Sequence, residues 1–177
     1  MVARINKLAE PDLYTGRQTP WTGKWRNPAG LFRIADGAAV SDKDFLALWR
    51  GFAPQNAGPL TRRAISGTHS PGFDIVLSPD KSISALWAIS PDFDRKRIER
   101  AVMDAAGVAL TGTVFRHCAA TRFGRAATEL RVDPADILAA VFPYHISREL
   151  DPQLDVSCVA HNLRPCGERC RFRPLHA

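Results

Sequence analysis

The sequence predicts an α+β fold in which helices flank a central antiparallel sheet. Residues 72–77 alternate like a half-buried strand and run directly into a helical pattern. Residues 136–147 and 154–163 are two further strand-like segments, joined by a connection short enough for an antiparallel pair. Strands and helices are mixed along the chain and do not alternate regularly, which favours α+β over a parallel α/β architecture.

The first third of the chain contains one predicted helix, because Gly and Pro residues interrupt the other candidate elements. Ser41 can cap this helix, and Asp42 and Asp44 suit the positive end of its dipole. The apolar residues that follow lie at i, i+3, i+4 and i+7 and predict one buried face: Phe45, Leu48, Trp49 and Phe52.

A helix is predicted directly after the strand at residues 72–77. Ser78 is a suitable N-cap and Pro79 a suitable first helical residue. Ile83, Leu86 and Trp87 then lie along one face. This geometry directs the unpaired N–H groups of the helix N-terminus beyond the end of the strand.

A longer helix is predicted from about residue 93 to residue 108, with Ile98, Val102 and Ala105 facing inward. Its opposite side carries several cations, which indicate a solvated face, with a DNA site as the alternative. Residues 112–118 and 121–132 are then predicted to be β segments, ahead of the antiparallel pair at residues 136–147 and 154–163.

The composition fits one globular domain, with 177 residues of which 45% are hydrophobic. A net charge of +6 favours an acidic partner such as nucleic acid, although a merely solvated basic surface explains it equally well. No apolar run could span a bilayer and no signal-peptide core follows Met1, so we expect a cytoplasmic protein. Its four cysteines do not form the pattern of a secreted disulfide scaffold, and we expect reduced thiols.

Three blocks of sequence carry a more specific signature. They are GFDIVLSPDKSISALWA at residues 72–88, FPYHISRELDPQL at residues 142–154 and WTGK at residues 21–24. In order and spacing they resemble the TrwC-type (MobF) conjugative relaxases, members of the HUH endonuclease superfamily. The resemblance implies an incomplete, palm-like relaxase domain over residues 1–163, followed by an unrelated basic, Cys-containing tail at residues 164–177.

The resemblance also implies a reaction and its partners. In such enzymes a tyrosine hydroxyl attacks a phosphodiester of the plasmid transfer origin, and a divalent metal, Mg²⁺ or Mn²⁺, held by three histidines polarises the phosphate. The implied partner is single-stranded or hairpin DNA of a transfer origin, with other relaxosome proteins as further candidates.

The metal positions of the family are substituted in this chain. Tyr144, Asp155 and Ser157 stand where the resemblance places the three histidines. Asp155 could ligate a hard cation and Ser157 only weakly, so we expect the metal site to be lost. A site that recruits the neighbouring His145 would need a bulge, because a one-residue step along a strand reverses the face of a side chain.

Four other residues match positions to which the family gives a role. Tyr14 is the candidate nucleophile, or else a loop aromatic, since the family's opening strand and first tyrosine pair are expected to be absent. Asp74 is the candidate proton acceptor or orienting group, or else a strand residue bonded near Ser78. Lys81 and Ser82, at the predicted helix start, are expected to contact DNA phosphate, with a solvated lysine as the alternative.

Three functions therefore remain open from the sequence. The first is a truncated relaxase domain that is impaired in cleavage. The second is a module that binds single-stranded DNA without cutting it, and the third is a decaying remnant. A metal at the positions of Tyr144, Asp155 and Ser157 would distinguish the first from the second.

Overall fold

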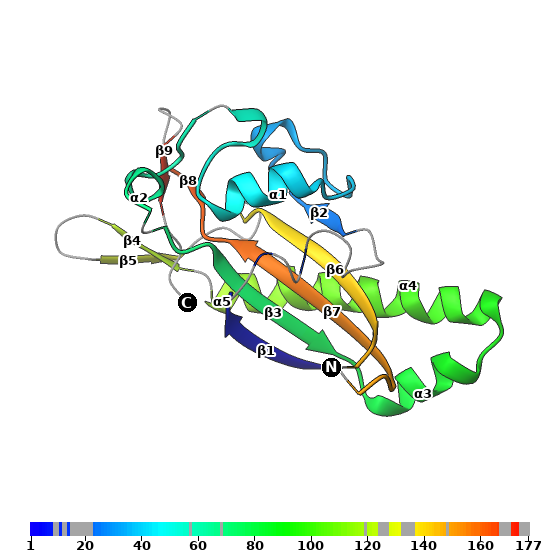
Figure 1. The fold of residues 1–177 in the computed structure, drawn as a ribbon. Helices are drawn as coiled ribbons and strands as arrows, with labels where there is room; N and C mark the ends of the chain where they lie inside the picture. Colours follow the sequence, from blue (N-terminus) through cyan, green and yellow to red (C-terminus); the bar gives the residue numbers. More distant parts are fainter. Residues whose placement is uncertain are drawn as a thin grey trace.

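The structure is a computed structural model, and it describes residues 1–8, 11, 14, 23–56, 58–67, 69–118, 120–123, 128–131, 137–147, 149–166 and 171–173. Its centre is a five-stranded antiparallel sheet in the order β1-β3-β7-β6-β2, with helices on both faces (Figure 1). This confirms the predicted α+β class. The strands are β1 (Val2–Lys7), β2 (Lys24–Arg26), β3 (Gly72–Ser78), β6 (Ala139–Ile146) and β7 (Pro152–His161).

One face of the sheet is covered by α1 (Asp42–Trp49). Ser41 caps this helix as predicted, since its hydroxyl oxygen accepts a hydrogen bond from the Asp44 amide at 3.1 Å. The helix ends at Trp49, earlier than the periodicity predicted. Short turns η3 (Leu31–Arg33), η4 (Pro54–Asn56) and α2 (Arg62–Ile65) surround it. The α1-face cluster comprises Tyr14, Trp25, Phe45, Leu48, Trp49, Leu138, Ala140, Phe142, Val159 and Leu163.

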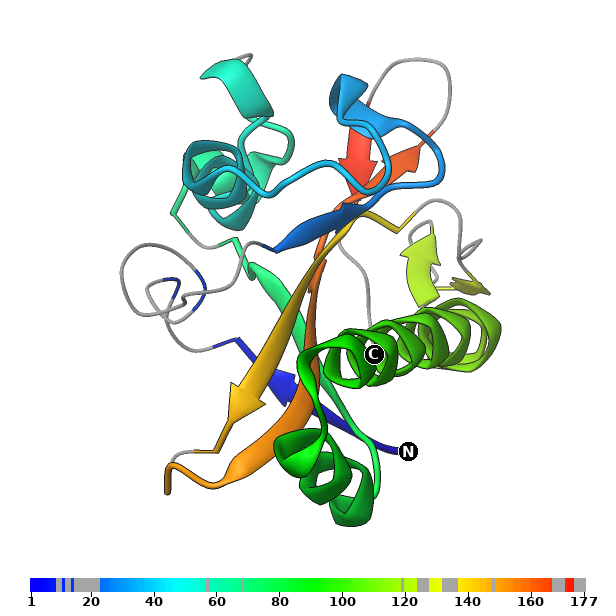
Figure 2. The same ribbon diagram turned by 90° about the vertical axis from the view of Figure 1, so that its right-hand side faces the viewer.

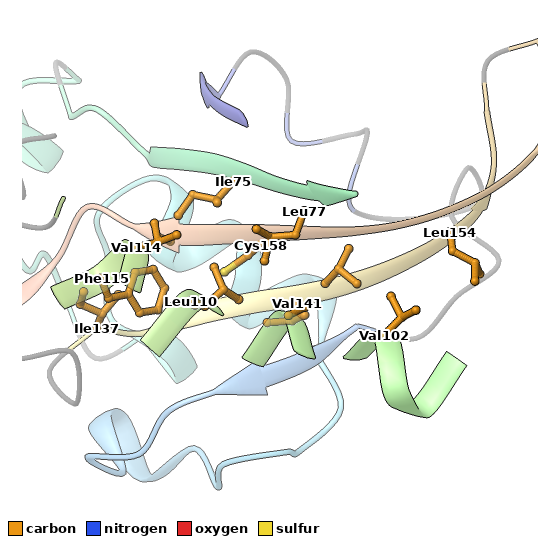
Figure 3. Packing of buried hydrophobic residues seen from close by; sticks show 14 residues of the cluster. Ile75, Leu77, Val102, Leu110, Val114, Phe115, Ile137, Val141, Leu154 and Cys158 are labelled. Atoms are coloured by element: carbon orange, nitrogen blue, oxygen red, sulfur yellow. The ribbon is translucent and has the colours of Figure 1, made fainter. Parts of the chain in front are cut away.

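The opposite face packs against α4 (Asp92–Ala109), which lies on the other side of the sheet from α1 (Figure 2). The shorter α3 (Lys81–Ile89) lies beside the N-terminal part of α4. Apolar side chains alternate along the strands, and those absent from the α1-face cluster fill this second core (Figure 3). Its members include Ile75, Leu77, Val102, Leu110, Val141, Leu154, Val156 and Cys158.

Residues 112–118 are helical, and the prediction of a β segment there is wrong. The chain continues from α4 through η5 (Leu110–Val114) into α5 (Phe115–Cys118). Val114 and Phe115 are buried in the second core, so packing of one helical face outweighs their β propensity. The expected β segment at 121–132 is a hairpin of β4 (Ala120–Phe123) and β5 (Thr128–Arg131), and a second hairpin joins β8 (Arg164–Cys166) to β9 (Arg171–Arg173).

Two local predictions near the sheet need correction. Ser78 ends β3, and Asp80 is the N-cap of α3, because its carboxylate accepts a hydrogen bond from the Ser82 amide at 2.9 Å. The expectation that no opening strand precedes Tyr14 is also wrong, since β1 pairs with the whole of β3. Among the residues that the structure describes, no helix has the length and apolarity to cross a membrane.

Candidate active site

Strand pairing gathers the predicted site residues on the α1 face of the sheet. Tyr144 of β6 lies directly opposite Asp155 of β7, and Ser157 follows two residues later on the same face. Asp74 of β3 is diagonal to Ser157, because Val76 is the direct partner of Ser157. The positions that the resemblance assigned to three metal ligands are therefore adjacent in space.

Tyr14 lies over this group of side chains. Its side chain is only 8% exposed. The ring centroid is 5.9 Å from that of Phe45, 6.0 Å from that of Trp49 and 5.7 Å from that of Phe142. Burial, followed by the charge of Asp74 and a hydrogen bond to it, raises the pKa of the Tyr14 phenol well above its ordinary value. Tyr14 is therefore a neutral phenol that donates its proton to Asp74.

Asp74 is the acceptor at the centre of the site. The Ser157 hydroxyl donates to Asp74 Oδ1 over 2.5 Å, and Tyr14 hydrogen-bonds to the same carboxylate and to Ser157. The partners of Asp74 are thus on β7 and in the Tyr14 segment, not at the end of its own strand near Ser78. A short hydroxyl–carboxylate bond of this kind is among the stronger neutral–ionic contacts.

Asp155 is held from the other side by a chain of hydrogen bonds that begins at α3. Lys81 Nζ donates to the Pro152 carbonyl at 2.9 Å and to Gln153 Oε1 at 3.1 Å. Gln153 Nε2 in turn donates to Asp155 Oδ1 at 2.9 Å. We refer to Lys81, Gln153 and Asp155 as the lysine chain.

The donors that the sequence assigned to DNA phosphate are used inside the protein. Lys81 holds the start of β7 through the lysine chain. Both the amide and the hydroxyl of Ser82 donate to Asp80 Oδ1, at 2.9 and 2.7 Å. Contact between these groups and a phosphate would require them to exchange their partners, which costs part of these bonds.

Tyr144 and His145 point to opposite faces of β6. Burial, with the charge of Asp74 as a second cause, raises the pKa of Tyr144 to about 12. His145 Nε2 lies 3.2 Å from Glu99 Oε1, and its ring packs on Trp87 at 5.1 Å. The pairing register does shift between Tyr144 and Ile146, yet His145 remains on the α4 face. It does not join Asp155 and Ser157.

The side chains at the three family positions do not fit a three-histidine metal site. Tyr144 is a neutral phenol, the Ser157 hydroxyl is bonded to Asp74, and Asp155 alone offers a carboxylate. In the described part of the chain, no group of three or more His, Cys, Asp or Glu side chains is arranged to hold a metal ion.

The sequence analysis missed His161, which lies on the same face of β7 as Ser157. Its side chain is fully buried, and neither ring nitrogen has a hydrogen-bond partner. The ring packs against Trp25 at 5.7 Å and against Phe45 at 5.3 Å. Burial is the main cause that lowers its pKa to about 3. The period of two from Asp155 was the available signal for its face.

Arg148, which we expected in a charge network of the β6–β7 connection, lies outside the described residues. The connection itself is held by Ser147, whose amide donates to the Asp151 carbonyl at 2.9 Å and whose hydroxyl accepts from the Asp151 amide at 3.2 Å. These bonds keep β6 and β7 in the register that places Tyr144 opposite Asp155.

Comparison with known proteins gives one family and a set of similar structures. The family described as TrwC relaxase matches residues 4–176, a range that includes most of the predicted tail. A metal-bound structure of the conjugative relaxase TrwC in complex with oriT DNA is 20% identical, with a TM-score of 0.74 over 98% of this chain and 61% of that chain. TrwC complexed with a 27-mer DNA comprising the recognition hairpin and the cleavage site is 21% identical, with a TM-score of 0.68 over 98% and 60%.

These similarities have a limited reach. At such identities the solved structures show the shared fold, and this chain spans about 61% of the length of the first of them. No curated protein matches the sequence.

Proposed function

This chain belongs to the TrwC relaxase family, and we propose that it is a relaxase-type domain that binds transfer-origin DNA but is impaired in strand cleavage. The observation that carries the proposal is the bond from Ser157 to Asp74, with Tyr144 and Asp155 at the other two metal positions. These groups form a closed polar cluster where a relaxase of this family would need open metal ligands.

Two physical obstacles to cleavage follow from this cluster. A tyrosine attacks a phosphodiester as its phenolate, and the raised pKa of Tyr14 makes the phenolate rarer than in water. The phosphate must also be neutralised, and the residues at the family's metal positions supply no three-ligand site for the cation that would do so. In this proposal the divalent metal of the family, Mg²⁺ or Mn²⁺, is not retained.

DNA binding is supported by two independent features. The chain carries a net charge of +6, which promotes association with a polyanion through counterion release. The structures that share its fold are of a relaxase in complex with oriT DNA, one of them with a recognition hairpin. We propose the same class of partner here, single-stranded or hairpin DNA, with relaxosome proteins as further partners in the cytoplasm.

Slow cleavage is a second candidate function, and one contact favours it. The Tyr14 hydroxyl donates to Asp74, which is the pairing expected of a nucleophile and its proton acceptor. In this alternative Tyr14 and Asp74 are catalytic, and Lys81 and Ser82 exchange their internal bonds for DNA phosphate.

The two candidates are tested with a fluorescent oligonucleotide that carries a hairpin and a single-stranded 3′ extension. Binding is followed by anisotropy, and cleavage by a covalent adduct on a denaturing gel in the presence of Mg²⁺ or Mn²⁺. We expect binding whose log–log salt slope is about −0.7 for each phosphate contacted in the single strand. We expect no adduct. An adduct that Tyr14→Phe abolishes would establish the second candidate, and salt-independent binding would contradict both.

A further inference from the structure

We propose that a cavity beside Tyr144 and Asp155 binds one nucleotide unit of single-stranded DNA, with its base on an apolar wall and its phosphate on lysines at the rim. The inference rests on the proposed DNA-binding function and adds a site and a base preference to it. The cavity lies between β2, β6, β7 and α4, and its volume of about 580 Å³ is within the range of small-molecule sites.

The wall of the cavity suits a nucleobase. It is apolar on the side formed by β6, β7 and α4, whose partly or fully buried side chains offer van der Waals contact to a flat ring. The residues that form this wall are Val102, Met103, Pro143, Leu154 and Val156.

The rim of the cavity carries cations from two different elements. Lys24 comes from β2 and Lys96 from α4, both are exposed, and neither forms an ion pair with any residue that the structure describes. Arg100 also lines the cavity, with its Nε 4.0 Å from Asp104 Oδ2. Two unpaired ammonium groups near an apolar wall match the phosphate and the base of one nucleotide.

The acidic groups of the cavity are not equivalent. Glu99 Oε1 already accepts from Trp87 Nε1 at 2.9 Å and faces His145 Nε2. Asp155 accepts from Gln153 through Oδ1 only, so that Oδ2 has no hydrogen-bond partner among the described residues. A carboxylate oxygen of this kind accepts from an exocyclic amino group, such as N4 of cytosine, and thymine has no such donor.

The cavity is continuous with the candidate active site, because Tyr144 and Asp155 belong to both. A nucleotide held there would place its neighbour in the strand along the free part of β6, beyond the stretch that pairs with β2. The substitution of a histidine position by Asp155 would thus serve base recognition. The lysine chain would orient the carboxylate for this purpose.

The test compares oligo(dC) and oligo(dT) by fluorescence anisotropy over a range of salt concentrations. The double substitution Lys24→Gln and Lys96→Gln should weaken binding about tenfold at low salt and reduce the salt slope by about 1.4, which corresponds to two single-strand phosphates. Lys43→Gln is the matched control, since Lys43 is an exposed cation on α1, away from the cavity. It should leave affinity and slope nearly unchanged.

Two further variants test the wall and the base preference. Met103→Trp should fill the cavity and weaken binding of both oligonucleotides, whereas Asp155→Asn should remove the preference of the wild type for oligo(dC). The inference is overturned if the lysine pair behaves like Lys43→Gln, if Met103→Trp binds as the wild type does, or if the wild type shows no dC preference. Failure of the wild type to bind either oligonucleotide would instead refute the proposed function, and the inference with it.

Discussion

Acidification should destabilise this protein through His161. The ring is fully buried and both of its nitrogens lack partners, so a proton there would be an uncompensated charge. Burial, with His69 as a second cause, lowers the pKa of His161 from 6.5 to about 3. Between these two pH values the unfolded state binds more protons than the folded state, so the free energy of unfolding falls as the pH is lowered.

The size of the effect follows from the pKa difference. At pH 5, which is 1.5 units below the unfolded pKa of 6.5, His161 should cost about 2 kcal/mol of stability relative to pH 7.5. At pH 3 the cost should be on the order of 5 kcal/mol. Part of the stability of the α1-face cluster is therefore lost before most carboxylates become protonated.

The measurement is urea unfolding at pH 7.5 and pH 5 for the wild type and for His161→Leu. Leucine is similar in size and does not titrate, so the packing change cancels when each variant is compared with itself at the two pH values. His69 and His145 remain in both proteins and contribute equally. The variant should lose about 2 kcal/mol less than the wild type on acidification. Equal losses would show that His161 is not the buried group responsible.

Three other predictions concern the sheet and the site. Gly72→Ala should cost several kcal/mol in thermal unfolding, because the added Cβ overlaps a carbonyl of β7 at a φ of 152°, whereas Gly107→Ala, in open space on α4, should stabilise by up to about 1 kcal/mol. Equal melting temperatures would contradict this. Lys81→Met should cost about 1 kcal/mol by breaking the lysine chain, and a loss of DNA affinity without a loss of stability would show that Lys81 instead contacts DNA. Calorimetric titration with Mn²⁺ should detect a site only after all three family positions are changed to histidine; no heat in the triple variant would show that the surrounding cluster also blocks the metal. These changes are Tyr144→His, Asp155→His and Ser157→His.

The sequence predicted those parts of the fold whose pattern is local. Ser41 and the periodic residues of α1 gave the helix its start, and the alternation in β3 and β7 gave the sheet. Residues 112–118 were misread because Val114 and Phe115 favour strands in isolation, while their burial as a continuation of α4 is a tertiary effect. The opening strand β1 was missed because its residues are exposed on both faces and show no period of two in burial.

The site was predicted at the level of position but not of bonding. The resemblance and the strand period indicated that Tyr144, Asp155 and Ser157 would be neighbours, and the register places them so. The lysine chain depends on the distance between the start of α3 and the start of β7, which no local pattern encodes. The same holds for His161, whose environment is assembled from β2 and α1.

The substitutions at the metal positions have changed the kind of group that faces Asp74. A neutral histidine nitrogen that binds a cation offers a lone pair to the metal, whereas the Ser157 hydroxyl offers a proton to a carboxylate. Asp74 now accepts from Ser157 as well as from Tyr14, so these two donors share one acceptor. If Asp74 were to accept the Tyr14 proton during cleavage, the bond to Ser157 would have to be given up, since that bond stabilises the carboxylate and lowers its basicity. Loss of the metal ligands and loss of an effective proton acceptor are therefore coupled through one hydrogen bond, and restoring a histidine at Ser157 should relieve both.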